Sequence, residues 1–191
     1  NFTFYNSDRL CVGDNLRKNL GYTALCQIYH ELGIHTFLTN RQRHSKEQYD
    51  SNTIMKMLVY SRLLFPVSKK SSYDNRERFF ENTDYSLDDI YRCLSFLDKH
   101  RENLQVWMND RIKKNYGRDT SLIYYDVTNY YFETDEPNDF LRKGVCKEYR
   151  PNPIVQMGPF IDNKGIPITY ELFPGNTNDC LTYRPNLGRI K

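Results

Sequence analysis

The sequence lacks the features of a membrane protein, of a secreted protein and of a nucleotide-binding protein. No apolar run approaches the roughly 20 residues of a membrane-spanning helix. The first residues do not have the basic-then-apolar order of a secretion signal. The glycine-rich patterns GxxxxGK and GxGxxG, which cradle phosphates, do not occur. We therefore expect a cytoplasmic protein that has no membrane partner.

Cysteine is too sparse and too scattered to form a disulfide framework. The 191 residues contain 5 cysteines and no CxxC pair, so free thiols in a reducing compartment are expected. We expect no zinc site either, because the spacing of a common zinc module is missing from the one group that could supply ligands: Cys26, His30, His35 and His44.

An excess of charge of one sign is also nearly absent. The chain has 27 Lys and Arg against 24 Asp and Glu, a formal net charge of +3, which is too small to indicate a nucleic-acid partner by itself. Aromatic residues are frequent, with 16 Tyr and 11 Phe against 1 Trp, and 39% of the residues are hydrophobic. This composition is typical of a folded globular protein.

The residues from about 14 to 116 have the periodicity of helices. Apolar side chains recur at helical spacing in two segments, of which one ends at Gly33 and the other before Pro66. The clearest helix is expected over 86–117. There Ser86 begins a capping-box pattern, acidic residues follow at the helix start, and basic residues precede the closing glycine.

From Thr120 the period becomes that of extended chain. Strands are expected over 121–133, 154–161 and 166–173, and the last two are joined by the turn DNKG. Because Pro159 removes a ladder donor, we expect its strand at a sheet edge or with a bulge.

A helix is expected to follow the third strand, with Thr177 or Asn178 as its cap. The expected fold is therefore α+β or α/β. It has a helical region over 1–118, followed by three antiparallel strands and one helix over 119–191. Because the chain begins with Asn and stops close to that helix, we expect it to be a piece of a longer protein.

Asp126 is out of place in the first expected strand, SLIYYDVTNYYFE, because Asp is depleted in strands. A carboxylate on a half-buried face is costly unless it is paired, hydrogen-bonded or bound to a cation. Two explanations stay open: a satisfied structural residue, or a ligand of a hard cation such as Mg²⁺. Strand alternation predicts that its face is shared by large, mostly apolar side chains: Leu122, Tyr124, Thr128, Tyr130 and Phe132.

Three segments in order, YYDVTNYYFE, LRKGVCKEYRPNPIVQMG and DNKGIPITYELFPGNTND, resemble the catalytic core of bacterial insertion-sequence transposases of the DDE type. The helical stretch SRLLFPVSKKSSYDNRERFFE is similar too. The resemblance implies an RNase H-like fold for 119–191 and a helical region over 1–118 that could bind DNA ends. In this family the first strand carries the first of three metal-binding acids, and Asp126 matches that position.

The resemblance implies metal-dependent DNA cleavage and strand transfer, with Asp126 as a catalytic residue that bridges two Mg²⁺ or Mn²⁺ ions roughly 4 Å apart. Water would nick the element's end, and the freed 3′-hydroxyl would join to target DNA. The other two acids of the family would fall after Lys191, so the chain as given is not expected to cut DNA. Asp162 and Asp179 are poor substitutes, since a turn and a helix start explain them. Cys146 stands where this family has a small hydroxyl residue.

Two basic segments are candidates for contact with DNA phosphates. The alternative is a pair of solvated loops whose charge nearby acidic residues offset. The resemblance implies double-stranded DNA as partner, both transposon ends and target, with the protein acting as a homo-oligomer at the bacterial nucleoid. The candidate residues are Lys69, Lys70, Arg76 and Arg78 in one segment, and Arg142, Lys143, Lys147 and Arg150 in the other.

Three hypotheses therefore follow from the sequence. The chain is part of an active DDE transposase, or it is a catalytically dead remnant that acts only as a DNA-binding or oligomerising module. The third is an unrelated α+β domain in which Asp126 is a satisfied structural residue.

Overall fold

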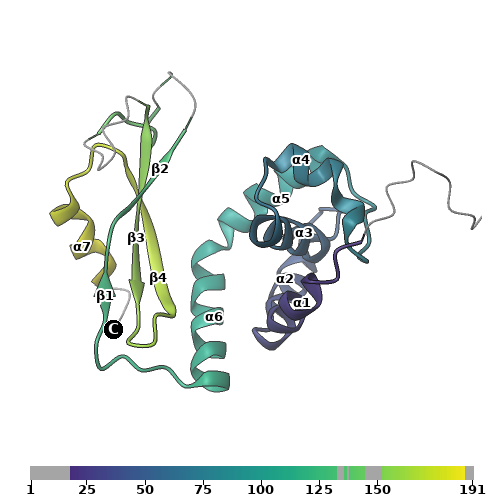
Figure 1. The fold of residues 1–191 in the computed structure, drawn as a ribbon, viewed down its shortest axis with the longest axis horizontal. Helices are drawn as coiled ribbons and strands as arrows, with labels where there is room; N and C mark the ends of the chain where they lie inside the picture. The colour runs from purple at the N-terminus through teal and green to yellow at the C-terminus, as the bar shows by residue number, and fades with distance from the viewer. Residues whose placement is uncertain (1–17, 133–135, 137, 145–151, 188–191) are drawn as a thin grey trace, which may run out of the picture. The chain divides into compact units, whose positions relative to one another are not determined.

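The computed structural model describes residues 18–132, 136, 138–144 and 152–187, and it divides the chain into two compact units, Asn1–Arg101 and Glu102–Lys191 (Figure 1). We call them the helical unit and the sheet unit. The described cysteines, Cys26, Cys93 and Cys180, are free thiols, as predicted. Among the described residues, no helix has the length and apolar character needed to cross a bilayer.

The helical unit is built around two clusters of buried side chains. One cluster joins α3 to α5 through Ile54 and Ile90. In the other, the rings of Tyr22, Tyr60 and Phe79 lie 5.4 to 5.6 Å apart between centroids. Its described elements are α1 (Tyr22–Glu31), α2 (Ile34–Gln42), α3 (Ser51–Leu64), α4 (Lys69–Asp74), the 3-10 turn η2 (Arg76–Arg78) and α5 (Leu87–Lys99).

Several predicted helix boundaries are confirmed. Gly33 separates α1 from α2 with a φ of 65°, which favours glycine, and α3 ends at Leu64, shortly before Pro66. At the start of α5, Ser86 Oγ accepts a hydrogen bond from the Asp89 N–H at 3.2 Å, and the Asp89 carboxylate accepts one from the Ser86 N–H at 2.8 Å. This is the predicted capping box.

The single helix expected over 86–117 is wrong, because the chain forms α5 and then a separate helix, α6 (Arg101–Tyr116). At the break, the His100 N–H bonds to the Leu97 carbonyl at 3.1 Å, which closes α5 with a tight turn. The six residues 98–103 contain no apolar side chain, so the apolar stripe that would hold one continuous helix is interrupted there. By its contacts α6 belongs to the sheet unit, whereas the sequence predicts it as part of the helical region over 1–118.

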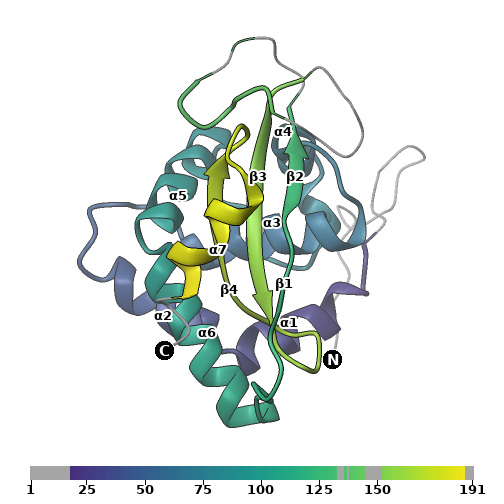
Figure 2. The same ribbon diagram turned by 90° about the vertical axis from the view of Figure 1, so that its left-hand side faces the viewer.

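The sheet unit contains an antiparallel sheet with β3 in its centre (Figure 2). On one side β3 pairs with β1 and β2, which follow one another along the same edge, and on the other side it pairs with β4. The mixed helix and antiparallel-sheet content confirms the α+β class. The elements are α6, β1 (Tyr124–Tyr125), β2 (Thr128–Tyr131), β3 (Ile154–Ile161), β4 (Pro167–Pro174) and α7 (Asp179–Leu187).

One face of this sheet is covered by α7. The Tyr125 hydroxyl donates a hydrogen bond of 2.5 Å to Thr182 Oγ1, and the Tyr125 ring lies 4.6 Å from the ring of Phe160. A Cβ at Gly158 would lie 2.2 Å from the Tyr125 hydroxyl oxygen, so only glycine leaves room for this ring. The predicted cap is also confirmed, since Asn178 Oδ1 accepts from the Cys180 N–H at 3.0 Å.

The β3–β4 hairpin is tied to the chain before β1 by a buried ion pair. Arg118 Nη1 lies 3.1 Å from Asp162 Oδ2, and both side chains are almost fully buried. Asp162 Oδ1 also accepts the backbone N–H groups of Lys164 and Ile166, each at 2.9 Å. Asp162 therefore lies in the turn, as predicted, and acts as its structural centre.

We predict that Asp162→Ala lowers the free energy of unfolding of the sheet unit by about 3–5 kcal/mol, because Arg118 is then left as an uncompensated buried charge. Urea unfolding followed by circular dichroism measures the change. Asp110→Ala, at an exposed site on α6, is the control and should change stability by less than about 0.5 kcal/mol. Equal effects of the two substitutions would contradict the structural role of the ion pair.

Asp119 gives a pH-dependent test of the same region. Hydrogen bonds from the Ser121 hydroxyl at 2.6 Å and from the Asn163 amide at 2.9 Å, together with one from the Ser121 N–H, lower the pKa of the Asp119 carboxyl from 3.8 to about 2. A depressed folded-state pKa stabilises the protein above the unfolded-state pKa, and this contribution is lost as the pH falls through the folded-state pKa.

We therefore predict that the stability difference between the wild type and Asp119→Asn shrinks as the pH falls from about 4 to about 2. Thermal unfolding at a series of pH values measures this difference. A difference that stays constant across that window would show that the hydrogen bonds do not favour the ionised carboxylate.

Candidate functional site

Asp126 lies at the junction between β1 and β2. Both strands pair with β3 in one register, and only residues 126 and 127 separate them. Continuing that register places Asp126 opposite Pro159 and Val127 opposite Gly158. The expected strand over 121–133 is therefore two short strands, and the carboxylate lies at the interruption.

Pro159 explains the interruption. It pairs with Tyr170 on β4, and the Tyr170 N–H points away from β3 to Gln105 Oε1 at 3.1 Å. Pro159 and Tyr170 therefore form a non-hydrogen-bonded pair of the antiparallel ladder, in which the backbone nitrogens of both residues point away from each other. The Pro159 nitrogen thus faces Asp126. Because proline has no N–H, the Asp126 carbonyl receives no ladder bond from it. The N–H that Pro159 lacks thus interrupts the neighbouring strand between β1 and β2.

The predicted edge position of this strand is wrong, because β3 is the central strand. The alternative expectation of a bulge is closer, since the β3–β4 register shifts between Phe160 and Ile161. Proline is normally excluded from central strands. Here it is tolerated because the hydrogen bond that it cannot donate would fall in the two-residue gap between β1 and β2, so no bond of either strand is lost.

The half-buried environment expected for Asp126 is also wrong. Side chains over 122–132 do alternate, but every even-numbered side chain, including Asp126, is exposed. Tyr124 and Tyr130 on the same face are 49% and 41% exposed, and this face is opposite the one that α7 covers. Asp126 Oδ1 accepts the Val127 N–H at 2.9 Å. No large desolvation cost has to be offset, and the carboxylate is accessible to a cation from solvent.

Asp126 would bring one carboxylate to a metal ion. Among the described residues, no three His, Cys, Asp or Glu side chains gather into a group that could hold a metal. A hard cation such as Mg²⁺ keeps several waters and takes one or two carboxylates together with substrate phosphates. The exposed carboxylate fits the first part of such a ligand set.

Two of the motif segments meet at one end of the sheet, and glycines allow the contact. Arg142 and Ile154 form a backbone bridge with N–H to carbonyl distances of 3.3 and 3.0 Å. A Cβ at Gly175 would lie 2.4 Å from the Arg142 carbonyl oxygen, and one at Gly144 would lie 1.8 Å from the Gly175 carbonyl oxygen. Neither glycine was predicted to have a role, although each follows directly on a motif residue, in LRKG and in PGNTND.

The first basic segment divides into exposed and packed residues. Lys69 and Lys70 are exposed on α4, and Lys70 Nζ lies 3.0 Å from the carboxylate of Asp74. The guanidinium of Arg76 instead lies 4.1 Å from the centroid of the Tyr73 ring and donates to the Tyr73 carbonyl. Arg78 lies 5.1 Å from the centroid of the Phe65 ring. The two arginines therefore hold this part of the helical unit together.

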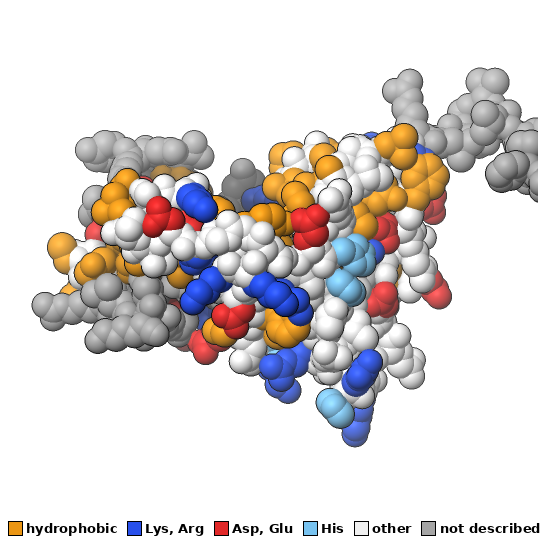
Figure 3. Space-filling model, turned by 90° about the horizontal axis from the view of Figure 1, so that it is seen from below, with side chains coloured by type: hydrophobic (Ala, Val, Ile, Leu, Met, Phe, Trp, Pro, Cys, Tyr) orange, Lys and Arg blue, Asp and Glu red, His pale blue; other side chains and the backbone are white. Residues whose placement is uncertain are grey.

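The second basic segment is described only in part. Arg142 Nη2 is 3.7 Å from Asp139 Oδ1, and the side chain of Lys143 is exposed. Lys147, Arg150 and Cys146 lie outside the described residues. On the face shown in Figure 3, Lys and Arg side chains are interspersed with Asp and Glu side chains.

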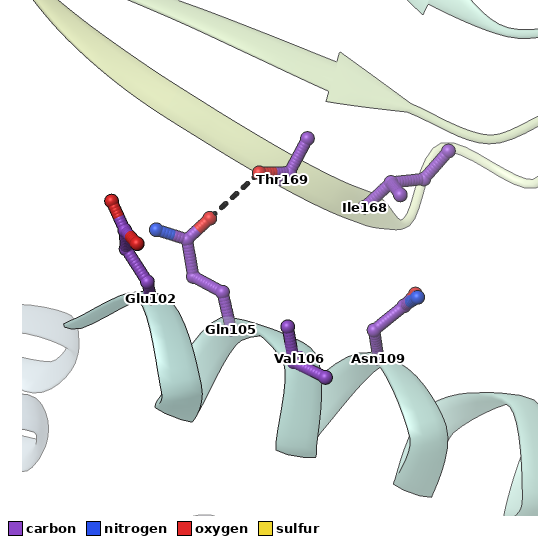
Figure 4. Close-up of a pocket in the computed structure, with 6 residues that line it drawn as sticks. All are labelled: Glu102, Gln105, Val106, Asn109, Ile168 and Thr169. Carbon is purple, nitrogen blue, oxygen red and sulfur yellow. Dashed lines mark hydrogen bonds between the residues drawn. The ribbon is translucent and has the colours of Figure 1, made fainter. Parts of the chain in front are cut away.

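A cavity of about 240 Å³ lies between α6 and β4 (Figure 4). Gln105 Oε1 accepts hydrogen bonds from the Thr169 hydroxyl at 2.8 Å and from the Tyr170 N–H. It thereby satisfies a donor on the free edge of β4, which would otherwise be open to pairing with another strand. The arrangement is explained by protection of this edge. The lining residues are Glu102, Gln105, Val106, Asn109, Ile168 and Thr169.

No family model, no curated protein and no solved structure matches the chain.

We predict that Pro159→Ala joins β1 and β2, because the new N–H can donate to the Asp126 carbonyl. The added hydrogen bond contributes about 1 kcal/mol. Without the proline ring the unfolded chain has more conformational freedom, which costs about 0.4–1 kcal/mol of stability. The free energy of unfolding should therefore hardly change. The diagnostic is hydrogen exchange by NMR, in which the amide of the substituted residue should be protected.

The matched control is Pro174→Ala. Residue 174 is an even-numbered position of β4, like Tyr170, so its nitrogen faces away from β3. Its new amide should exchange rapidly. Rapid exchange at position 159 as well would show that the missing proline donor does not cause the strand interruption.

Proposed function

We propose that the chain is the N-terminal and early catalytic part of a DDE-type transposase, a metal-dependent enzyme that cleaves and transfers DNA strands. The observation that carries the proposal is the exposed carboxylate of Asp126, which lies between the first two strands of an antiparallel sheet. An RNase H-like fold for the sheet unit is part of the proposal. It is supported by the order of the elements, in which the β1–β2 strand, β3 and β4 pair consecutively and α7 follows.

In this proposal Asp126 is the first metal ligand. Mg²⁺ or Mn²⁺, when bound, would supply activation of the attacking oxygen and stabilisation of the leaving oxygen in an in-line displacement at phosphorus. The sheet fixes the position of the carboxylate, because β1 and β2 hold it from both sides in one register with β3. A ligand flanked on both sides by strands of one sheet is held more rigidly than a ligand on a long loop.

The proposed partners are DNA and further copies of the chain. The exposed Lys69 and Lys70 can approach a phosphate backbone without losing an internal contact to an aromatic ring. Arg142 and Lys143 lie on the segment that bridges to the end of β3, so DNA bound there would reach the same sheet that carries Asp126.

We predict that Mn²⁺ binds weakly at Asp126 and broadens the NMR signals of residues near it, on β1, β2 and the facing part of β3. Asp126→Asn should abolish this broadening, because the amide oxygen carries no charge. Asp110→Asn, which alters a carboxylate that is also exposed but lies on α6, should leave it unchanged. Broadening that persists in Asp126→Asn would remove Asp126 from the metal site.

Activity is tested in the full-length protein, since the resemblance places the other two acids after Lys191. The expected result is nicking of supercoiled DNA that requires Mg²⁺ or Mn²⁺ and is lost in Asp126→Asn. A full-length protein that binds DNA and metal but never nicks would favour the dead-remnant hypothesis. Unchanged metal binding together with a large loss of stability in Asp126→Asn would favour the unrelated structural domain.

A further inference from the structure

The helical unit contains a cavity of about 440 Å³ between the ends of α2 and α5. Two segments that are about 50 residues apart in the sequence form its walls. One is the end of α2 with the loop that follows, and the other is the last turn of α5. The lining residues are Asn40, Arg41, His44, Ser45, Lys46, Phe96, Lys99 and His100.

The lining is unusually one-sided in charge. Among the described residues it includes three side chains that are cationic at neutral pH, Arg41, Lys46 and Lys99, as well as two histidines, and no carboxylate. The acidic residue beside Lys99 in the chain, Asp98, lies 3.8 Å from the guanidinium of Arg101. For a chain with a formal net charge of only +3, this is a local concentration of positive charge.

The positive charges of both cavity walls act on the imidazole of His100. Burial lowers the pKa of the His100 imidazole, and the nearby positive charges of Arg41 and Lys99 lower it further. Residues from both walls of the cavity thus repel a proton at the same ring. An anion in the cavity would relieve this repulsion.

Favourable interaction with helix dipoles explains only part of the cluster. Arg41 lies in the last turn of α2 and Lys99 in the last turn of α5, where cations are stabilising. His44 and Lys46 lie beyond the end of α2, and the dipole effect falls off outside the last turn. Asn40 and Ser45 add neutral hydrogen-bonding groups to the lining, which suit an oxyanion as well.

Aromatic rings hold two of the basic groups in place. The guanidinium of Arg41 lies 5.3 Å from the centroid of the Phe37 ring. The imidazole of His100 meets the Phe96 ring edge-on at a centroid distance of 4.8 Å. Fixed donors lose less conformational freedom when a ligand binds.

We propose that this cavity is a phosphate-binding site, and that the phosphate belongs to a DNA backbone. Lys and Arg around a concave site with neutral donors are the groups that recognise phosphate oxygens. The volume exceeds that of one phosphate group, which leaves room for the adjoining sugars. DNA as the source rests on the proposed function, whereas the phosphate chemistry rests on the cavity alone.

The first test titrates inorganic phosphate into the wild-type chain and follows its amide signals by NMR. We expect shifts confined to residues 40–46 and 96–100. Shifts that are absent there, or that are spread over all exposed lysines, would overturn the proposal.

The second test measures binding of duplex DNA by fluorescence anisotropy as a function of salt. The variant Lys46→Gln/Lys99→Gln should bind about tenfold more weakly, and the slope of log K against log salt should fall by about 2, roughly 1 for each lost phosphate contact. The control Lys113→Gln/Lys114→Gln removes the same charge from two exposed positions of α6. Equal weakening in both variants would show an effect of net charge only and would overturn DNA as the ligand.

The outcomes separate this inference from the proposed function. Phosphate shifts and lysine-dependent DNA binding without Mn²⁺ binding at Asp126 would support the cavity and overturn the metal site. Phosphate shifts with DNA binding that does not depend on Lys46 and Lys99 would support a site for free phosphate and overturn DNA as its source.

Discussion

The missing N–H of Pro159 is the constraint around which the sheet unit is arranged. A central strand normally bonds on both sides, and proline gives up one of those bonds. Because the nitrogen of Pro159 faces the β1–β2 side, the loss falls on Asp126 and leaves the β4 side intact. The neighbouring Gly158 is the second residue of β3 that is unusual in a central strand. Because it has no side chain, it leaves room for the Tyr125 ring and so for the contact with α7. Two residues that suit strands poorly thus determine where the sheet opens and where it packs.

The sheet unit uses carboxylates in two opposite ways. Asp162 is fully buried, and an arginine and two backbone N–H groups satisfy it. Removing charge from such a place is costly, so its role is to hold the hairpin. Asp126 lies at the strand interruption itself, and its side chain is exposed. An exposed carboxylate held between two strands of one sheet can reach a cation from solvent, whereas the carboxylate of Asp162 cannot.

Local signals in the sequence predicted the parts of the fold that depend on neighbouring residues. The capping box at Ser86, the turn at Gly33 and the cap at Asn178 involve groups within a few positions, and all three were found. The exposure of Asp126 could not be predicted in this way. Alternation gives the two faces of a strand, but which face is covered depends on α7, more than 50 residues later in the chain.

Net charge misleads for a similar reason. Summed over the chain, acidic and basic residues almost cancel, and the basic segments that stand out in the sequence include Arg76 and Arg78, which pack against rings. The positively charged lining of the cavity cannot be recognised in the sequence, because Lys46 and Lys99 come together only when α3 packs against both α2 and α5. Coulomb interactions depend on distance in space, so the electrostatic character of a small unit is a property of its fold. Here the fold gathers positive charge around a cavity whose described lining contains no carboxylate.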